Sequence, residues 1–402
     1  MGNKEIFKPT AAGQKGMLEL HQLFFRILLD IRKTSCYHCP QKGGRRAMKP
    51  IRKKKTKLAN IKKIIDRQDE IVTGRISSLN LPKFKKYVIC NLRGGIGKTT
   101  IAFNLSYLLN DVLVIDTCPQ GNLSYFYDSQ YFSNNRTTVK DLILPYILPG
   151  LGKPSRTAKK IGATNPFFQN KNAFYIPSTS ELYLLPSQLS TAINQAKTLT
   201  GSQQEEALRN ILYSLKYEID RELEENNLQH VLIDTSPFFS GATHLSWHAS
   251  DALIVPVRTD QQSINSLELL IDVLENPASE FRRNMPKDGV TPKIQLVILT
   301  HCTWSTRSGA RNIPNQQTKV YLEKIRDIVS RNIQHFTTDD PDNHILLLDD
   351  FLGTGRISTA LSKPVTLLQA GETMRINRVK TTVNQSVEKI KAQLQFIANS
   401  II

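Results

Sequence analysis

A glycine-rich loop at residues 91–100 has the residue types that bind phosphate. It reads Asn-Leu-Arg-Gly-Gly-Ile-Gly-Lys-Thr-Thr, follows the apolar run 87–90 and precedes a stretch at 101–109 with the pattern of a helix. Glycines let the backbone approach an anion, which the N–H groups of the loop and of the helix N-terminus then face. Lys98 would reach the β- and γ-phosphates, and the Thr99 hydroxyl would ligate Mg²⁺. The predicted nucleotide-binding residues are Gly94, Gly95, Ile96, Gly97, Lys98, Thr99 and Thr100.

Two aspartates end apolar runs that are typical of buried parallel strands. Asp116 ends the run 112–116, and Asp234 ends the run 230–234. A carboxylate at the C-terminal end of a parallel strand lies in the crevice where ligands bind. Asp234 suits the acid that holds Mg²⁺, often through water. For either aspartate alone, a strand-end cap or turn residue is an equal alternative, but the two together with the glycine-rich loop favour one site for ATP and Mg²⁺.

The alternation of short β-rich runs with helical stretches from residue 85 onward predicts an α/β fold. We expect a mostly parallel twisted β-sheet flanked by helices, as in P-loop nucleotide-binding proteins. Residues 145–172, with frequent Pro, Gly and Asn, are predicted to form a surface insertion, and the apolar stripe from 383 to 401 predicts a helix packed on the core. The predicted strands are 87–91, 112–116, 182–185, 230–234, 252–257, 294–300 and 344–348, and the predicted helices include 205–226 and 318–333.

The positive charge of the chain is concentrated before the loop. Residues 1–87 contain 22 Lys/Arg and 6 Asp/Glu, which accounts for most of the net charge of +18. We therefore expect an irregular segment at 1–47, a basic arm and helix at 48–84, and the ATPase domain at 85–402. The basic run 49–57 could be a solvated arm, a DNA-contacting tail or a dimer-contacting helix. Because Met48 precedes this run, translation starting there is a further hypothesis.

The five cysteines are too sparse for a disulfide framework, and no secretory signal opens the chain, so we expect a cytoplasmic protein. Cys36 and Cys39 resemble half of a zinc site. A structural zinc ion needs four ligands and no second cluster follows, so free thiols are the favoured interpretation. The apolar run 18–31 is too short to span a membrane and contains charged residues. We expect no stable membrane insertion.

Together these segments resemble the ParA/Soj-type ATPases, the deviant Walker-A group that also includes MinD. The resemblance covers roughly residues 85–400. The family loop, Lys-Gly-Gly-x-Gly-Lys-Thr-Thr, is matched except at its first position, Arg93. The family motif Asp-x-Asp-Pro-Gln-Gly-Asn is matched at 116–122, except that Cys118 replaces the second aspartate. The Walker-B ending Ile-Asp-Thr-Pro-Pro is similar to residues 233–237. Further landmarks are similar at 184–187, 249–257, 266–270 and 356–365.

The resemblance implies a nucleotide-driven switch that segregates plasmid or chromosomal DNA. Monomers would bind ATP and pair face to face as an ATP-dependent homodimer, which would bind DNA non-specifically and so be nucleoid-associated. A ParB-like protein or another cargo adaptor would stimulate hydrolysis to ADP and phosphate. In the family, the first loop lysine reaches into the partner's active site, and the second aspartate of the Asp-x-Asp motif positions the attacking water.

This chain departs from the family at both of those positions. Arg93 keeps the positive charge and adds a planar donor fork suited to phosphate, so the contact across the dimer can survive. Cys118 is a mostly neutral thiol at pH 7 and a weak acceptor, so it cannot replace a carboxylate that orients water. Asp116 is the acid that could substitute for it. The predicted catalytic residues are Lys98, Asp116 and Arg93, the predicted Mg²⁺ ligands are Thr99 and Asp234, and slow hydrolysis is expected.

Several alternatives stay open at this level. A hydrolysis-impaired binding switch could regulate or position a non-DNA cargo with the same fold. A MinD-like membrane positioner would need a basic amphipathic C-terminal tail, and an electron-transfer ATPase would need a mate for Cys302; neither is found. DNA contact has two candidate sources, the basic run 49–57 and a set of C-terminal residues. That set is Arg356, Lys363, Arg375, Arg378 and Lys380.

Overall fold

The computed structural model of the chain describes residues 60–134, 137–148, 150–239, 241–306 and 312–402. Every described residue belongs to one compact unit, 53–402. The expectations for Cys36 and Cys39, for the apolar run 18–31, for Met48 and for the basic run 49–57 fall outside the described residues.

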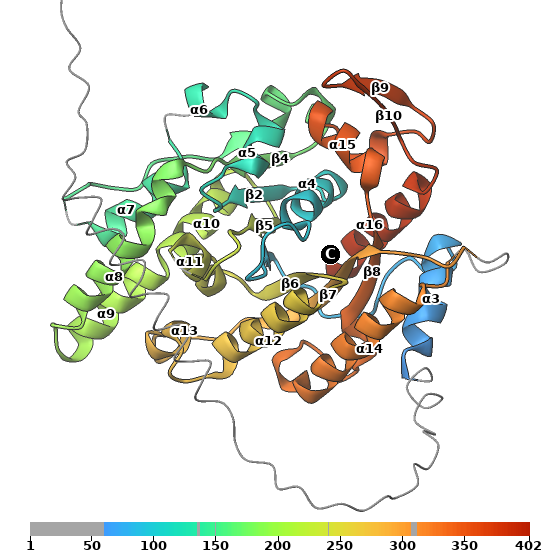
Figure 1. The fold of residues 1–402 in the computed structure, drawn as a ribbon. Helices are drawn as coiled ribbons and strands as arrows, with labels where there is room; N and C mark the ends of the chain where they lie inside the picture. Colours follow the sequence, from blue (N-terminus) through green and yellow to red (C-terminus); the bar gives the residue numbers. More distant parts are fainter. Residues whose placement is uncertain (1–59, 135–136, 149, 240, 307–311) are drawn as a thin grey trace, which may run out of the picture. The chain divides into compact units, whose positions relative to one another are not determined.

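An eight-stranded sheet forms the centre of the described unit, as the sequence predicts (Figure 1). The strand order is β3-β4-β2-β5-β1-β6-β7-β8, and all neighbours pair in parallel except β3 with β4. Because β1 lies between β5 and β6, the carboxyl end of β1 is a topological switch point, where ligands bind in such sheets. The strands are β1 Lys86–Ile89, β2 Val112–Asp116, β3 Lys159–Lys160, β4 Ala173–Ile176, β5 His230–Asp234, β6 Ala252–Arg258, β7 Lys293–Cys302 and β8 Ile345–Asp349.

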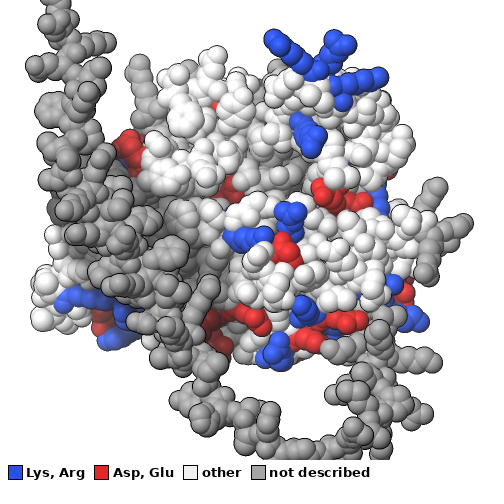
Figure 2. Space-filling model, viewed as in Figure 1, with Lys and Arg blue, Asp and Glu red and all other residues white. Residues whose placement is uncertain are grey.

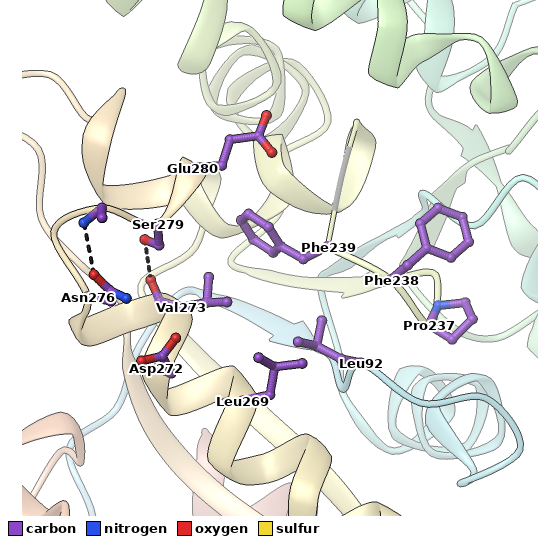
Figure 3. Close-up of a pocket in the computed structure, with 11 residues that line it drawn as sticks. Leu92, Pro237, Phe238, Phe239, Leu269, Asp272, Val273, Asn276, Ser279 and Glu280 are labelled. Atoms are coloured by element: carbon purple, nitrogen blue, oxygen red, sulfur yellow. Dashed lines mark hydrogen bonds between the residues drawn. The ribbon is translucent and has the colours of Figure 1, made fainter. Parts of the chain in front are cut away.

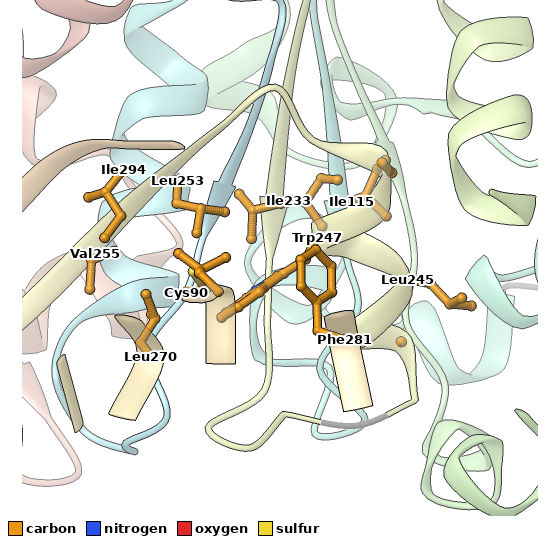
Figure 4. Close-up of a cluster of buried hydrophobic side chains, with 14 of the residues drawn as sticks. Cys90, Ile115, Ile233, Leu245, Trp247, Leu253, Val255, Leu270, Phe281 and Ile294 are labelled. Carbon is orange, nitrogen blue, oxygen red and sulfur yellow. The ribbon is translucent and has the colours of Figure 1, made fainter. Parts of the chain in front are cut away.

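Successive residues of β1 contribute to two separate hydrophobic clusters, because side chains alternate across the two faces of a sheet. Val88 belongs to the first cluster, which also contains Cys90, and Ile89 belongs to the second. Trp247 and Phe281 lie in the first cluster with Cys90, and the two aromatic ring centroids are 5.7 Å apart (Figure 4). The central strands are therefore covered on both faces, which explains their nearly continuous apolar sequences.

Helices cover both faces of the sheet. The first cluster takes buried residues from α7 Val139–Ile147, α8 Leu185–Ala196, α9 Gly201–Leu212, α10 Ser214–Glu225, α11 Ala242–Ala249, α12 Gln261–Glu275, α13 Glu280–Arg283 and α14 Gln316–Arg331. The second cluster takes them from α4 Lys98–Leu108, α5 Asn122–Tyr127, α15 Leu352–Leu361 and α16 Val387–Ile401. A short helix, α6, spans Tyr131–Asn134. None of the helices in the described part of the chain has the length and apolar character needed to cross a membrane.

Two expectations about local structure are wrong. The predicted strand 182–185 is a 3₁₀ turn that leads into α8, because Leu185, Leu189 and Ile193 follow a helical spacing and are buried on one face. The strand that pairs with β2 on this side of the sheet is β4, directly after the predicted insertion, and the two-residue β3 lies outside it at the edge. The predicted helix 205–226 is two helices, α9 and α10, which are separated at Tyr213.

The described residues before the loop are joined to the body of the described unit. Helix α3, Lys62–Val72, packs against α16 and β8 and buries Ile64 and Ile71. Arg67 on this helix is buried, and its guanidinium donates hydrogen bonds to the carbonyl oxygens of Asp342 and Ile345 at 2.7 and 2.5 Å. The C-terminal stripe is buried as predicted: Val383, Val387, Ile390, Leu394, Ile397 and Ile401 are each at most 1% exposed.

A two-stranded hairpin stands apart from the main sheet. Strands β9 Thr373–Ile376 and β10 Val379–Thr382 pair antiparallel, with Arg375 opposite Lys380. The turn residues Asn377 and Arg378 both have positive φ values, 49° and 69°, which is the geometry of a two-residue turn matching the twist of the strands. Strand β10 packs against α15.

Candidate nucleotide-binding site

The glycine-rich loop connects the carboxyl end of β1 to the N-terminus of α4, as predicted. Gly95 and Gly97 have φ values of +69° and +91°, in the region that other residues rarely adopt, and Gly97 directly precedes the helix. A Cβ atom on Gly94 would lie 3.8 Å from Pro237, in the loop that follows β5. The loop is therefore shaped for the close approach of an anion to its backbone and to the first turn of α4.

The structure brings Lys98, Thr99 and Asp234 together. The Lys98 side chain is buried, and its Nζ donates hydrogen bonds to the carbonyl oxygens of Arg93 at 2.7 Å and Asn91 at 3.3 Å. Burial lowers the pKa of this amino group, although the charge of Asp234 opposes the shift. The Thr99 hydroxyl donates to Asp234 Oδ2 at 2.7 Å. The two residues expected to hold Mg²⁺ thus share one hydrogen bond at the end of the loop.

Asp116 and Asp234 are side by side, because they occupy paired positions of β2 and β5. Both are buried. Burial, reinforced by the charge of Asp116, raises the pKa of Asp234 to about 7. Burial also raises the pKa of Asp116 to about 6, against the hydrogen bonds that it accepts. Asp234 Oδ1 has no hydrogen-bond partner within the described residues. A buried, unpartnered carboxylate oxygen beside a hydroxyl is a donor set that fits Mg²⁺, a cation that prefers oxygen ligands.

The two carboxylates differ in whether all of their oxygen atoms already accept hydrogen bonds. Asp116 accepts hydrogen bonds from the backbone N–H of Ser124 at 2.8 Å, from its hydroxyl at 2.8 Å and from the N–H of Cys118 at 3.1 Å. Asp116 therefore organises the turn after β2. Ser124 had no signal in the sequence, because its role depends on the fold of that turn.

Cys118 lies close to both carboxylates, at the position where the family motif has its second aspartate. Its residue is 7% exposed, and burial, together with the neighbouring charge of Asp116, raises the pKa of its thiol to about 12. The thiol is therefore protonated at neutral pH. It cannot take a proton from water in the way that a carboxylate can.

Arg93 does not point away from the loop into solvent. Its guanidinium forms an ion pair with Asp260 and donates a hydrogen bond to Ser263 Oγ at 2.9 Å. Asp260 is the N-cap of α12 and accepts a hydrogen bond from the N–H of Ser263 at 2.9 Å. Asp260 was not singled out from the sequence, and its contact with Arg93, 167 residues earlier, has no local signal.

Two hollows flank the loop. The larger, about 1060 Å³, is lined by Gly95, Gly97 and Thr100 of the loop and helix α4. Its other lining residues come from the carboxyl ends of β7 and β8 and from the hairpin, among them His301, Asp350, Ile376 and Val379. This larger hollow begins at two glycines of the loop, and its volume is large enough for a sugar and a base. The smaller, about 500 Å³, is an apolar groove between Leu92 and Phe238 on one side and Leu269 on α12 on the other (Figure 3). This groove adjoins the loop from outside and contains none of the predicted nucleotide-binding residues.

The candidate DNA-contacting residues of the C-terminal region fall into two groups. Arg375, Arg378 and Lys380 are exposed on the hairpin and form no ion pair with another described residue. Figure 2 shows Lys and Arg side chains gathered at the corner where β9 and β10 lie in Figure 1. Lys363 is instead paired with Glu372 at 3.6 Å, and Arg356 lines the larger cavity.

A glycine-rich loop between β1 and α4, at the switch point of a parallel sheet, with a lysine and a threonine opposite a strand-end aspartate, defines a P-loop nucleotide-binding protein. A family model described as an AAA domain matches residues 84–286. The chain belongs to this family and is a ParA/MinD-like P-loop ATPase.

Similar proteins are spread over several organisms. An uncharacterized protein of Methanocaldococcus jannaschii is 29% identical over 248 residues, which cover 60% of this chain and 78% of that protein. The sporulation initiation inhibitor protein Soj of Bacillus subtilis is 22% identical over 286 residues, which cover 70% of this chain and 98% of Soj. Among solved structures, an McdA variant of Cyanothece in complex with ATP is 21% identical, with a TM-score of 0.48, and covers 70% of this chain and 87% of that chain.

Proposed function

We propose that the chain binds ATP with Mg²⁺ in the loop at 93–100 and hydrolyses ATP to ADP and phosphate. The observation that carries the proposal is the pair of 2.7 Å contacts, from Lys98 Nζ to the Arg93 carbonyl and from Thr99 Oγ1 to Asp234. An amino group that is held by loop carbonyls can exchange them for phosphate oxygens, and Asp234 has an oxygen available for the metal. Mg²⁺ at this position would neutralise charge on the β- and γ-phosphates.

Equilibrium binding of a fluorescent ATP analogue to the full chain tests this proposal. We expect Lys98→Ala to weaken binding at least tenfold, because it removes a charge-assisted contact to phosphate. Thr99→Ala should abolish the strengthening of binding by added Mg²⁺. Thermal unfolding of both variants shows whether they are folded. A folded Lys98→Ala variant that binds the analogue as tightly as the wild type would refute the proposal.

The proposal extends to a partition role. Two ATP-bound copies would pair face to face, with Arg93 of each copy directed at the other's nucleotide. The homodimer would bind DNA non-specifically and associate with the nucleoid, and a ParB-like or other adaptor protein would trigger hydrolysis and release during the segregation of plasmid or chromosomal DNA. The unpaired cations of the hairpin support the DNA contact, and the basic run 49–57 is a second source of phosphate contacts.

A second candidate function follows from Cys118. Because its buried thiol is protonated and the Asp116 oxygens already accept three hydrogen bonds, neither residue would serve as a free base beside the proposed metal-binding carboxylate of Asp234. The chain would then act as an ATP-dependent binding switch with slow turnover, which regulates or positions a non-DNA cargo. ATP turnover measured with and without DNA separates the two functions. A large stimulation by DNA favours partition, whereas a slow rate in both conditions favours the switch.

A further inference from the structure

The most informative contact that the proposed ATP site does not use is the ion pair between Arg93 and Asp260. Arg93 occupies the first position of the loop motif 93–100, and Asp260 caps α12. Both side chains are about three-quarters buried, with 26% and 28% exposure. Ser263 completes the arrangement by accepting a second hydrogen bond from the guanidinium. Arg93 is thus held against its own protomer by two groups at the N-terminus of α12.

The backbone of Arg93 is also engaged. Its carbonyl oxygen accepts the hydrogen bond from Lys98 Nζ at 2.7 Å, so one residue connects α12 through its side chain with the phosphate-binding amino group through its main chain. Withdrawal of the guanidinium from Asp260 would free the loop segment that carries this carbonyl. We therefore expect two changes to favour each other: the loss of the contact between the Arg93 guanidinium and Asp260, and the movement of the Lys98 amino group from the Arg93 carbonyl to a phosphate.

We propose that Asp260 is a positioning residue that holds Arg93 in its own protomer and thereby sets how readily two ATP-bound copies pair. The proposal rests on the proposed ATP-dependent pairing. A guanidinium that reaches across to a partner's phosphate must first leave Asp260 and Ser263. The strength of this contact opposes dimer formation, and the γ-phosphate of the partner's nucleotide, a multiply charged anion, competes with the single carboxylate for the same planar donors.

Replacement of Asp260 by Asn isolates this effect. Asn is as good an N-cap as Asp, so the hydrogen bond from Ser263 N–H and the start of α12 are retained, while the charge opposite Arg93 is removed. Hydrogen bonds to charged groups are stronger than those between neutral groups, so release of Arg93 becomes easier. We expect the dimerisation constant at saturating ATP and Mg²⁺ to increase about three- to tenfold. Asp272→Asn is the matched control, because Asp272 is an exposed residue of the same helix with no ion pair among the described residues.

Sedimentation of the full chain at a series of protein concentrations measures the dimerisation constant. The increase caused by Asp260→Asn should disappear in an Arg93→Ala background and persist in an Arg93→Lys background, which a merely structural effect on α12 would not produce. If the wild type dimerises with ATP but Asp260→Asn does not increase dimerisation, or increases it equally without Arg93, the role of Asp260 is refuted. If neither the wild type nor Asp260→Asn dimerises, the proposed ATP-dependent pairing itself is refuted.

Discussion

Asp234→Asn is expected to make the nucleotide-free protein more stable at neutral pH while it impairs the Mg²⁺-dependent site. Asp234 is fully buried, and its pKa is raised from 3.8 to about 7. A pKa shift of one unit corresponds to about 1.4 kcal/mol, so keeping this carboxylate ionised in the folded protein above pH 7 costs about 4 kcal/mol. Asn avoids that cost, and its side-chain oxygen can still accept the hydrogen bond from Thr99.

The net gain is smaller than the full electrostatic cost. The amide NH₂ group of Asn would occupy the place of Asp234 Oδ1, which has no partner among the described residues, and a buried unpaired donor costs about 1–3 kcal/mol. We therefore expect Asp234→Asn to increase the free energy of unfolding by about 2 kcal/mol at pH 7.5.

The pH dependence gives the sharper test. Between pH 3.8 and about 7 the folded protein keeps the proton on Asp234 that the unfolded chain has lost, so the stability of the wild type falls as pH rises. Asn has no such proton. The difference between variant and wild type should therefore grow by about 2 kcal/mol from pH 5.5 to pH 7.5. Urea denaturation at both pH values, without nucleotide or Mg²⁺, measures it.

Asp116→Asn is the matched control, and we expect it to lower the free energy of unfolding instead of raising it. Asp116 is also buried with a raised pKa, but its oxygens accept three hydrogen bonds, from Ser124 and Cys118. In Asp116→Asn, the amide NH₂ group would replace one of these accepting oxygens and would face a backbone N–H group that can only donate to it. We therefore expect Asp116→Asn to be less stable than the wild type at pH 7.5. If Asp234→Asn is no more stable at pH 7.5 than at pH 5.5 relative to the wild type, the assignment of a desolvated, ionised Asp234 is wrong.

Two further outcomes concern turnover and DNA. Cys118→Asp should raise ATP turnover at least tenfold, because it restores a carboxylate that can orient water, and it should lower stability without nucleotide because Asp116 and Asp234 lie beside it. Cys118→Ser is the control, and equal turnover in the two variants would show that the carboxylate is not limiting. Neutralising Arg375, Arg378 and Lys380 together should reduce the slope of log DNA affinity against log salt by about 2 to 3, without changing ATP binding. An unchanged slope would assign the DNA contact to another part of the chain.

The sequence was most informative where apolar runs end in a functional residue. The strands 112–116 and 230–234 were predicted with the bounds that the structure gives, because central strands buried on both faces have continuous apolar sequences and the ligand crevice selects a polar residue at their ends. The meeting of Lys98, Thr99 and Asp234 could be predicted for the same reason. The run 182–185 was misassigned, because a short apolar run fits a strand and a helix equally well.

The long-range contacts could not be predicted. The sequence places Arg93 in the loop but does not mark Asp260, and their pairing depends on β1 and β6 being neighbours in the sheet. The three hydrogen bonds on Asp116 depend in the same way on the fold of the turn after β2. These contacts decide which charged groups already have a partner within the protein. The motif alone therefore identifies the type of site, but not which of its charged side chains are already paired.

Under the proposed partition function, the hairpin of β9 and β10 would link nucleotide binding to DNA binding. Ile376 and Val379 help to line the cavity beside the glycines of the loop, while Arg375 and Lys380 of the same two strands are exposed. One two-stranded element therefore takes part in both the nucleotide cavity and the cationic surface. If nucleotide binding changes the position of this element, thermodynamic linkage requires DNA to alter nucleotide affinity by the same factor by which nucleotide alters DNA affinity. DNA would then act as an effector of the ATP site as well as a surface to which the protein binds.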